Sequence, residues 1–335
     1  MTVRVNKPAF NLREKLSELE RPIGIKGNEV LQSETVEDAF DVLGCGRKNF
    51  IINGAMEIWQ RGTSFSNISN GSYTADRFLN QKTSTTNVER VSVTEDSMNA
   101  YGFRYAMRQT AVSASTIKPL QIIEKHPLFV KGNKFTFSFW ARANKARNYS
   151  FSHYDGSSSF NGVTGIKIET SWKRFVIPLT LVSDPSSYLR LHITSSGDAG
   201  DWLETTGWQY EQGSVATPFE HRFYGEEFAL CERYYERHNF SASQYMAVVV
   251  NYATGTQMRT TLPFLTRKRT TSPTVTYSGS YLVYPPNEAA TLTGSDNNDT
   301  CARINVTSAT SHAAGTAHLI LSSGAGNYLE IEDEL

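Results

Sequence analysis

The sequence predicts a mainly β protein in which an N-terminal arm with short helices precedes an antiparallel β-sandwich, a linker helix and a smaller C-terminal β-sandwich. Two observations predict this class. From Asn49 onward, short runs rich in Val, Ile, Thr, Tyr and Phe are separated by clusters of Gly, Asn and Ser. Residues 1–48 show helical spacing instead. We therefore expect an arm over 1–48, a first sandwich over 49–223, and the helix with the second sandwich over 224–335.

The arm is predicted to hold two short amphipathic helices. Asn11 can cap the first helix, which Arg21-Pro22 ends. The second opens near Thr35 and ends at Gly44. Segments below about 40–60 residues seldom bury enough surface to fold alone, so the apolar stripes need a partner. The body, sister copies and another protein are all open as that partner. The expected docking residues are Phe10, Leu12, Leu16, Leu19, Val36, Phe40 and Leu43.

Clean alternation of apolar and polar residues predicts the strands of the first sandwich. It is seen in residues 135–142, 172–177 and 188–193. Because side chains of a strand point alternately to opposite faces, each run offers one face to a core and one to solvent. Antiparallel strands follow from this pattern.

The C-terminal third begins with helical spacing over residues 225–237, which predicts a linker between two β units. Short β-type runs follow and predict a second, smaller sandwich. These runs cover residues 245–252, 258–262, 274–277, 302–306 and 318–321.

Charge and apolar content exclude several classes of partner. Lysine plus arginine equals aspartate plus glutamate, 33 against 33, so no global field attracts nucleic acid or an anionic membrane. No apolar run approaches the ~20 residues that span a bilayer, and the first residues lack the apolar region of a signal peptide. Cys45, Cys231 and Cys301 are widely spaced and are expected to be free thiols of a protein assembled in a reducing cytoplasm.

Several segments resemble tail proteins of tailed bacteriophages. Residues 48–65, with the phrase INGAMEIWQRG, and residues 73–78 look like the opening of jelly-roll modules in those proteins. Residues 208–222, WQYEQGSVATPFEHR, look like their close, and residues 226–235 like the continuation. The arm is similar to the attachment ends of such fibers. The resemblance implies a virion protein whose 49–223 domain is a carbohydrate-binding-module-like jelly roll, and commonly a homotrimer.

The expected positions of the first and last strands agree with this resemblance. Residues 49–65 would form the first strand and its loop, and residues 207–219 the last strand. A jelly roll pairs its terminal strands, so the ends of the domain should lie close together.

Catalysis is not expected. Glycoside hydrolysis needs two carboxylates about 5–9.5 Å apart, and no spacing singles out a pair. No two histidines are spaced as metal ligands, and no nucleophile-elbow pattern occurs. The available carboxylates are Asp76, Glu124, Asp155, Asp201, Glu204 and Glu211.

Two kinds of ligand site are weighed. Glu57 and Glu211 would be neighbours if the terminal strands pair, and could then hold a structural Ca²⁺, although ion pairing with Arg61 or Arg222 competes. No other cofactor is expected. Sugar binding would use aromatic faces with polar side chains beside them, and core packing is the alternative for each aromatic. The candidates on one sheet face are Tyr154, Asp155, Tyr188, Arg190 and His192.

The leading hypothesis is a phage virion structural protein made in the host cytoplasm. It would be a tail fiber or fiber-like adaptor whose arm docks to the tail, adaptor or nozzle and whose β domains contact host surface glycan or a neighbouring tail protein. A capsid-decorating or baseplate component without receptor binding is the first alternative. A polysaccharide depolymerase is the second, from a different class.

Overall fold

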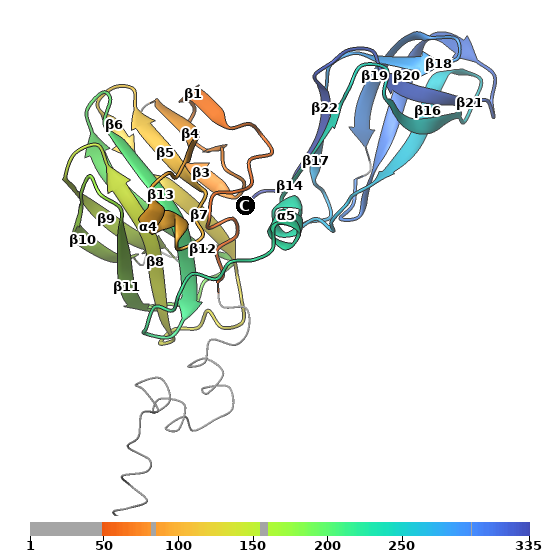
Figure 1. The fold of residues 1–335 in the computed structure, drawn as a ribbon. Coiled ribbons are helices and arrows are strands. Elements are labelled where there is room, and N and C mark those ends of the chain that lie inside the picture. The colour runs from red at the N-terminus through yellow and green to blue at the C-terminus, as the bar shows by residue number, and fades with distance from the viewer. Residues whose placement is uncertain (1–48, 82–84, 155–159, 296) are drawn as a thin grey trace, which may run out of the picture. The chain divides into compact units, whose positions relative to one another are not determined.

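The computed structural model describes residues 49–335 with the exception of 82–84, 155–159 and 296. It confirms the prediction of a mainly β protein (Figure 1). Several predictions fall outside the described residues: the arm helices, Cys45, the sugar contact Asp155, and the docking residues Phe10, Leu12, Leu16, Leu19, Val36, Phe40 and Leu43. Among the residues that are described, no helix is long and apolar enough to cross a membrane.

The first sandwich consists of a six-stranded and a seven-stranded antiparallel sheet. The first has the order β1 (Ser64–Ile68), β4 (Thr86–Ser92), β5 (Tyr105–Ala111), β13 (Trp202–Gln212), β8 (Lys134–Ala143) and β11 (Lys173–Thr180). The second has the order β10 (Phe160–Ile168), β9 (Arg147–Tyr154), β12 (Tyr188–Gly197), β7 (Pro119–Glu124), β3 (Phe78–Asn80) and β2 (Ser72–Tyr73), with β6 (Ser115–Ile117) also on β12. A four-residue helix, α4 (Asp96–Asn99), lies between β4 and β5.

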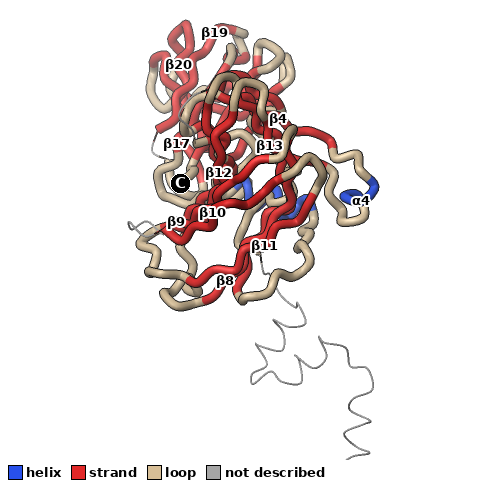
Figure 2. The backbone as a smooth tube through the Cα atoms, turned by 90° about the vertical axis from the view of Figure 1, so that its left-hand side faces the viewer, coloured by secondary structure: helices blue, strands red, loops and turns tan. Residues whose placement is uncertain are grey.

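Eight of these strands form the predicted jelly roll. Strands β5-β13-β8-β11 lie in one sheet and β7-β12-β9-β10 in the other, so most connections cross between the sheets. In Figure 2, β8 and β11 lie together in one layer, and β9, β10 and β12 in the other. The alternating runs of the sequence are strands β8, β11 and β12. Their inward residues, such as Phe137, Phe139, Leu189 and Leu191, fill the core.

The ends of the jelly roll lie together, as predicted, but residues 49–63 form a loop rather than a first strand. Asn49 acts as a backbone mimic: its amide nitrogen donates to Trp208 O at 3.0 Å, and its amide oxygen accepts from Tyr210 N at 3.0 Å. Asn53 does the same inside the loop, donating to Ile58 O at 2.9 Å. Its φ of 59° lies in the left-handed region that asparagine tolerates. Hydrogen bonds between a side chain and the backbone leave no repeating pattern in the sequence. The alternation of apolar and polar residues therefore could not predict this loop.

The linker helix is shorter than predicted. α5 spans Tyr224–Glu232, and from Tyr235 the chain instead forms β14 (Tyr235–Phe240). Strand β14 pairs with β22 (Asn327–Glu332), which also pairs with β17 (Thr274–Ser278), and the three make a small sheet. The gain of a sheet partner for residues 235–237 explains why helical spacing there did not give a helix.

The remaining strands close into a barrel, where the sequence predicted a smaller sandwich. The order is β15 (Tyr245–Asn251), β16 (Gly255–Pro263), β20 (Cys301–His312), β19 (Glu288–Ser295), β18 (Tyr281–Tyr284) and β21 (Ala317–Ser322), and β21 pairs again with β15. Val249, Met258, Ile304 and Val306 fill the interior. A sandwich strand and a barrel strand share the same alternation, so the sequence pattern does not distinguish them. Cys231 and Cys301 are free thiols, as expected.

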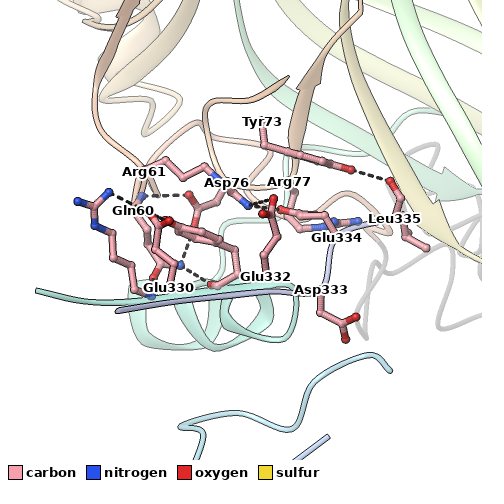
Figure 3. Close-up of polar contacts among 12 residues, drawn as sticks. Gln60, Arg61, Tyr73, Asp76, Arg77, Glu330, Glu332, Asp333, Glu334 and Leu335 are labelled. Atoms are coloured by element: carbon pink, nitrogen blue, oxygen red, sulfur yellow. Dashed lines mark hydrogen bonds and ion pairs between the residues drawn. The ribbon is translucent and has the colours of Figure 1, made fainter. Parts of the chain in front are cut away.

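A polar junction joins the jelly roll to the C-terminal residues (Figure 3). Its centre is Arg77, whose side chain is 1% exposed and forms an ion pair with Glu334. Arg77 Nη2 also donates to Ile122 O at 2.6 Å, and the guanidinium lies 3.4 Å from the ring centroid of Tyr234. Tyr73 Oη donates to Leu335 O at 2.9 Å. The last residues described are thereby attached to the seven-stranded sheet.

A buried carboxylate lies beside this ion pair. Asp76 accepts hydrogen bonds from Gln60 N at 3.0 Å and from Gln60 Nε2 at 2.6 Å. Gln60 Nε2 also donates to Tyr235 O at 2.8 Å. Burial raises the pKa of Asp76 to about 6, although Arg61 and the Gln60 bonds act in the opposite direction. The junction therefore contains a group that takes up a proton on mild acidification.

Replacing Arg77 should strongly destabilise the protein. Arg77→Met leaves the buried Glu334 carboxylate without its main partner, and breaking such a pair costs about 3 kcal/mol or more. Arg104→Met is the matched control, because Arg104 is 66% exposed and pairs with Glu57 at the surface, where an ion pair contributes less than about 1 kcal/mol. Urea unfolding monitored by tryptophan fluorescence measures both. Equal losses in the two variants would contradict the role given to Arg77.

Asp76 should make stability depend on pH with a defined sign. Its folded-state pKa is about 6, above the ordinary value of 3.8, so the folded state binds the proton more tightly. This contribution is fully present below about pH 4 and is lost as the pH rises through 6, a change of about 3 kcal/mol. Asp76→Asn should lack it. Unfolding of both proteins in urea from pH 4 to 7 tests this, and parallel stability curves would rule the effect out.

Candidate functional site

The candidate site lies on the outer face of the seven-stranded sheet. In β12, Leu189, Leu191 and Ile193 point into the core, so Tyr188, Arg190 and His192 point outward. Strand β9 pairs with β12 so that Tyr154 stands opposite Arg190. Strand β7 on the other side places Ile122 opposite Arg190 and Leu120 opposite His192. Three neighbouring strands thus build one surface.

We call the group Tyr154, Tyr188 and Arg190 the tyrosine–arginine face. The two ring centroids are 6.5 Å apart. The Arg190 guanidinium carbon lies 5.5 Å from the Tyr154 centroid and 5.6 Å from that of Tyr188, within the range of cation–π attraction. All three side chains are partly exposed. The cation therefore helps to hold two aromatic rings at the surface.

The floor of this face is buried and largely apolar. Leu120 is 0% exposed and Ile122 is 4% exposed, although both point away from the core of the jelly roll. His192 is 5% exposed, so it lies in the floor rather than among the exposed side chains. Burial lowers its pKa to about 3, and the charges of Lys118 and Arg190 act in the same direction. His192 is a neutral imidazole at physiological pH.

The structure brings together the four described residues of the predicted sugar site. Tyr154, Tyr188 and Arg190 lie as expected on one sheet face, and their role in binding stays a prediction. His192 shares the face, but it is corrected from an exposed contact to a buried one, because its ring is covered. Sequence reasoning missed Lys118 and the floor from β7. The register of β7 against β12 decides their position, and no local pattern carries that register.

Glu57 and Glu211, the predicted calcium pair, have separate partners within the protein. Glu57 pairs with Arg104 at 3.0 Å. Glu211 Oε1 accepts from Gln209 Nε2 and from Thr217 N, each at 2.9 Å. The first segment is a loop rather than a paired strand, and the two carboxylates therefore have separate partners. Within the described part of the chain, no group of three or more His, Cys, Asp or Glu could hold a metal ion.

The described carboxylates weighed for catalysis are engaged in structural contacts. Glu204, fully buried, lies between Arg108 at 2.5 Å and Arg142 at 2.6 Å. The others hold cations or amide groups in the same way, namely Asp76, Glu124, Asp201 and Glu211. These contacts give each carboxylate a role in stability.

A groove of about 520 Å³ lies elsewhere on the jelly roll, between residues of β10 and β11. Its lining combines apolar residues, including Phe151, Val163, Ile177 and Leu179, with the polar Lys134, Thr180 and Ser214. Phe151, the aromatic residue of this lining, is 1% exposed, so its ring is not open to stack on a sugar. The tyrosine–arginine face is therefore the better candidate for a polar ligand.

Comparison with known proteins gives distant likenesses only. No family model matches the chain, and no curated protein matches it. The carbohydrate-binding module TmCBM61, solved with β-1,4-galactotriose, is 12% identical over 50% of this chain and 100% of its own, with a TM-score of 0.33. A family 11 carbohydrate-binding module from Clostridium thermocellum, solved with a mixed-linked tetrasaccharide, is 10% identical over 46% and 98%, with a TM-score of 0.29.

The enzymatically active domain of tailspike protein 4 from bacteriophage CBA120 is also similar. It is 14% identical over 44% of this chain, with a TM-score of 0.33, and the present chain spans 21% of its length. At these identities and TM-scores the likenesses establish neither a family nor an activity for this protein.

His192 should stay neutral throughout the physiological range. Because burial lowers its pKa to about 3, its ring proton signals in a histidine-selective NMR titration should not move between pH 8 and about 5. Comparison with His192→Gln assigns the signal. An inflection near the ordinary histidine pKa of about 6.5 would show that the ring is open to solvent.

Proposed function

We propose that this protein binds a carbohydrate through the tyrosine–arginine face. The observation that carries the proposal is the pair of partly exposed rings of Tyr154 and Tyr188, held 6.5 Å apart by the guanidinium of Arg190. The face of an aromatic ring packs against the C–H groups of a pyranose, while nearby polar groups fix the orientation of the sugar.

The structure of the face suits a polymer more than a small molecule. The rings stand at the ends of strands β9 and β12, and the neighbouring strand β7 places the buried side chains of Leu120 and Ile122 on the same side of the sheet. Partly exposed rings at the surface of a sheet let a chain of sugars extend beyond the residues in contact. Binding without cleavage is part of the proposal, because the described carboxylates weighed for catalysis serve ion pairs and hydrogen bonds elsewhere.

We propose further that the protein is a structural component of a tailed-phage virion. The support is the resemblance of residues 48–65 and 208–222 to the opening and close of phage tail modules, and these segments meet through Asn49 and Trp208. A tail fiber or adaptor, made in the host cytoplasm, would dock by its arm and present the face to host glycan. Assembly as a homotrimer would multiply weak contacts. A capsid-decorating or baseplate position is the alternative.

Substitution of the two tyrosines should weaken glycan binding selectively. Tyr154→Ala and Tyr188→Ala each remove one stacking ring, so affinity should fall about tenfold per variant. Tyr252→Ala is the matched control, because Tyr252 is an exposed tyrosine of the barrel with Arg259 stacked at 3.9 Å. A glycan array followed by affinity gel electrophoresis measures binding. The proposal fails if the full chain retains no glycan, or if the control variant loses as much affinity as the other two.

A further inference from the structure

The tyrosine–arginine face carries positive charge that the described residues leave uncompensated. Arg190 and Lys118 form no ion pair with any carboxylate in the part of the chain that the structure describes. This differs from Arg108, which pairs with Glu204, and from Arg147, which pairs with Asp201. Among its described residues, this face thus has a local excess of positive charge, although the whole chain has 33 basic and 33 acidic residues.

Lys118 lies close enough to Arg190 for the two positive charges to interact. It stands two residues before Leu120, on the same side of the sheet, and is half-buried. Burial lowers the pKa of Lys118, and the charge of Arg190 lowers it further. Both cations act on His192 as well. The acidic residue at the edge of the face, Glu124, is engaged with Arg233 at 3.3 Å rather than with either of them.

Two nitrogen atoms of the face are buried without a hydrogen-bond partner among the described residues. They are Arg190 Nε and His192 Nδ1. A buried donor or acceptor without a partner destabilises the folded protein. Arg190 Nε lies on the edge of the guanidinium fork that bidentate recognition of an oxyanion uses. An anionic oxygen brought by a ligand to the partly exposed Arg190 side chain would balance the positive charge of Arg190 and Lys118.

We propose that this face binds a saccharide with an anionic substituent, a carboxylate, sulfate or phosphate. The anionic group lies over Arg190 and Lys118, and the sugar ring packs on Tyr154 or Tyr188. This inference rests on the proposed carbohydrate binding and adds the charge class of the ligand. The neutral His192 beneath keeps the floor uncharged, so the cations above it set the preference.

The test compares matched pairs of polymers that differ only in charge. The full chain is run in affinity gels with polygalacturonate or its methyl ester, with dextran sulfate or dextran, and with phosphorylated or dephosphorylated mannan. In at least one pair the acidic polymer should bind at least tenfold more tightly. Its advantage should shrink as salt rises from about 0.05 to 0.5 M, because exposed charges are screened. The pair with the largest difference identifies the anionic group.

Charge-removing variants assign the preference to this face. Arg190→Gln and Lys118→Gln should each reduce the acidic advantage about tenfold, as expected for a charge-assisted hydrogen bond of about 1.5 kcal/mol. For Lys118→Gln, which leaves both rings and their contacts with Arg190 in place, thermal unfolding and any binding to the neutral polymer should stay at the level of the unmodified protein. Arg259→Gln, at the comparable arginine–tyrosine contact of the barrel, should change neither.

The outcomes separate the two proposals. Equal binding of acidic and neutral polymers overturns the anionic inference and leaves carbohydrate binding standing. An acidic preference that survives in Arg190→Gln and Lys118→Gln, or that Arg259→Gln also loses, overturns it too, since the charge responsible then lies elsewhere. If no polymer binds and no array glycan is retained, the proposed function fails, and the inference fails with it.

Discussion

The buried guanidinium of Arg77 is the constraint on which the described structure depends most. A charge removed from water has to be balanced by an opposite charge and by well-placed hydrogen-bond acceptors. Arg77 obtains these from distant parts of the chain: Glu334 near the end of the sequence, Ile122 O on β7, and the ring of Tyr234 after α5. Strand β7, which supplies the floor of the tyrosine–arginine face, is therefore fixed to the C-terminal residues by one cation.

The same electrostatic rule explains why the tyrosine–arginine face stands out. Most partly buried cations of the jelly roll have a carboxylate partner, and the junction adds the cationic stack of Arg61 on Tyr235 at 3.5 Å. Arg190 instead lies between two tyrosine rings, which attract it more weakly than a carboxylate does. The zero net charge of the chain says nothing of this difference, because recognition depends on where charge is left unbalanced.

The sequence predicted the structure best where apolar and polar residues alternate regularly along a strand. Alternation over residues 188–193 placed Tyr188, Arg190 and His192 on the outward side of one strand, as the structure has them. It did not show that His192 is covered, because alternation specifies a direction and not what packs above it. The loop built by Asn49 and Asn53 depends on bonds between side chain and backbone, which leave no repeating signal. The closed barrel required pairing between β15 and β21, far apart in sequence.

The position of β22 has a consequence for biosynthesis. This strand is central in its sheet, between β14 and β17, and Glu334 lies two residues beyond its end. Both neighbouring strands are synthesised before β22, so their edges stay unpaired until β22 has been made. Arg77 likewise has no ion pair with Glu334 until that residue has been added. A polypeptide terminated before residue 327 would keep those exposed strand edges, which invite pairing with other chains and attack by proteases. Strand β22 thus covers edges of β14 and β17 that are open as long as it has not been synthesised.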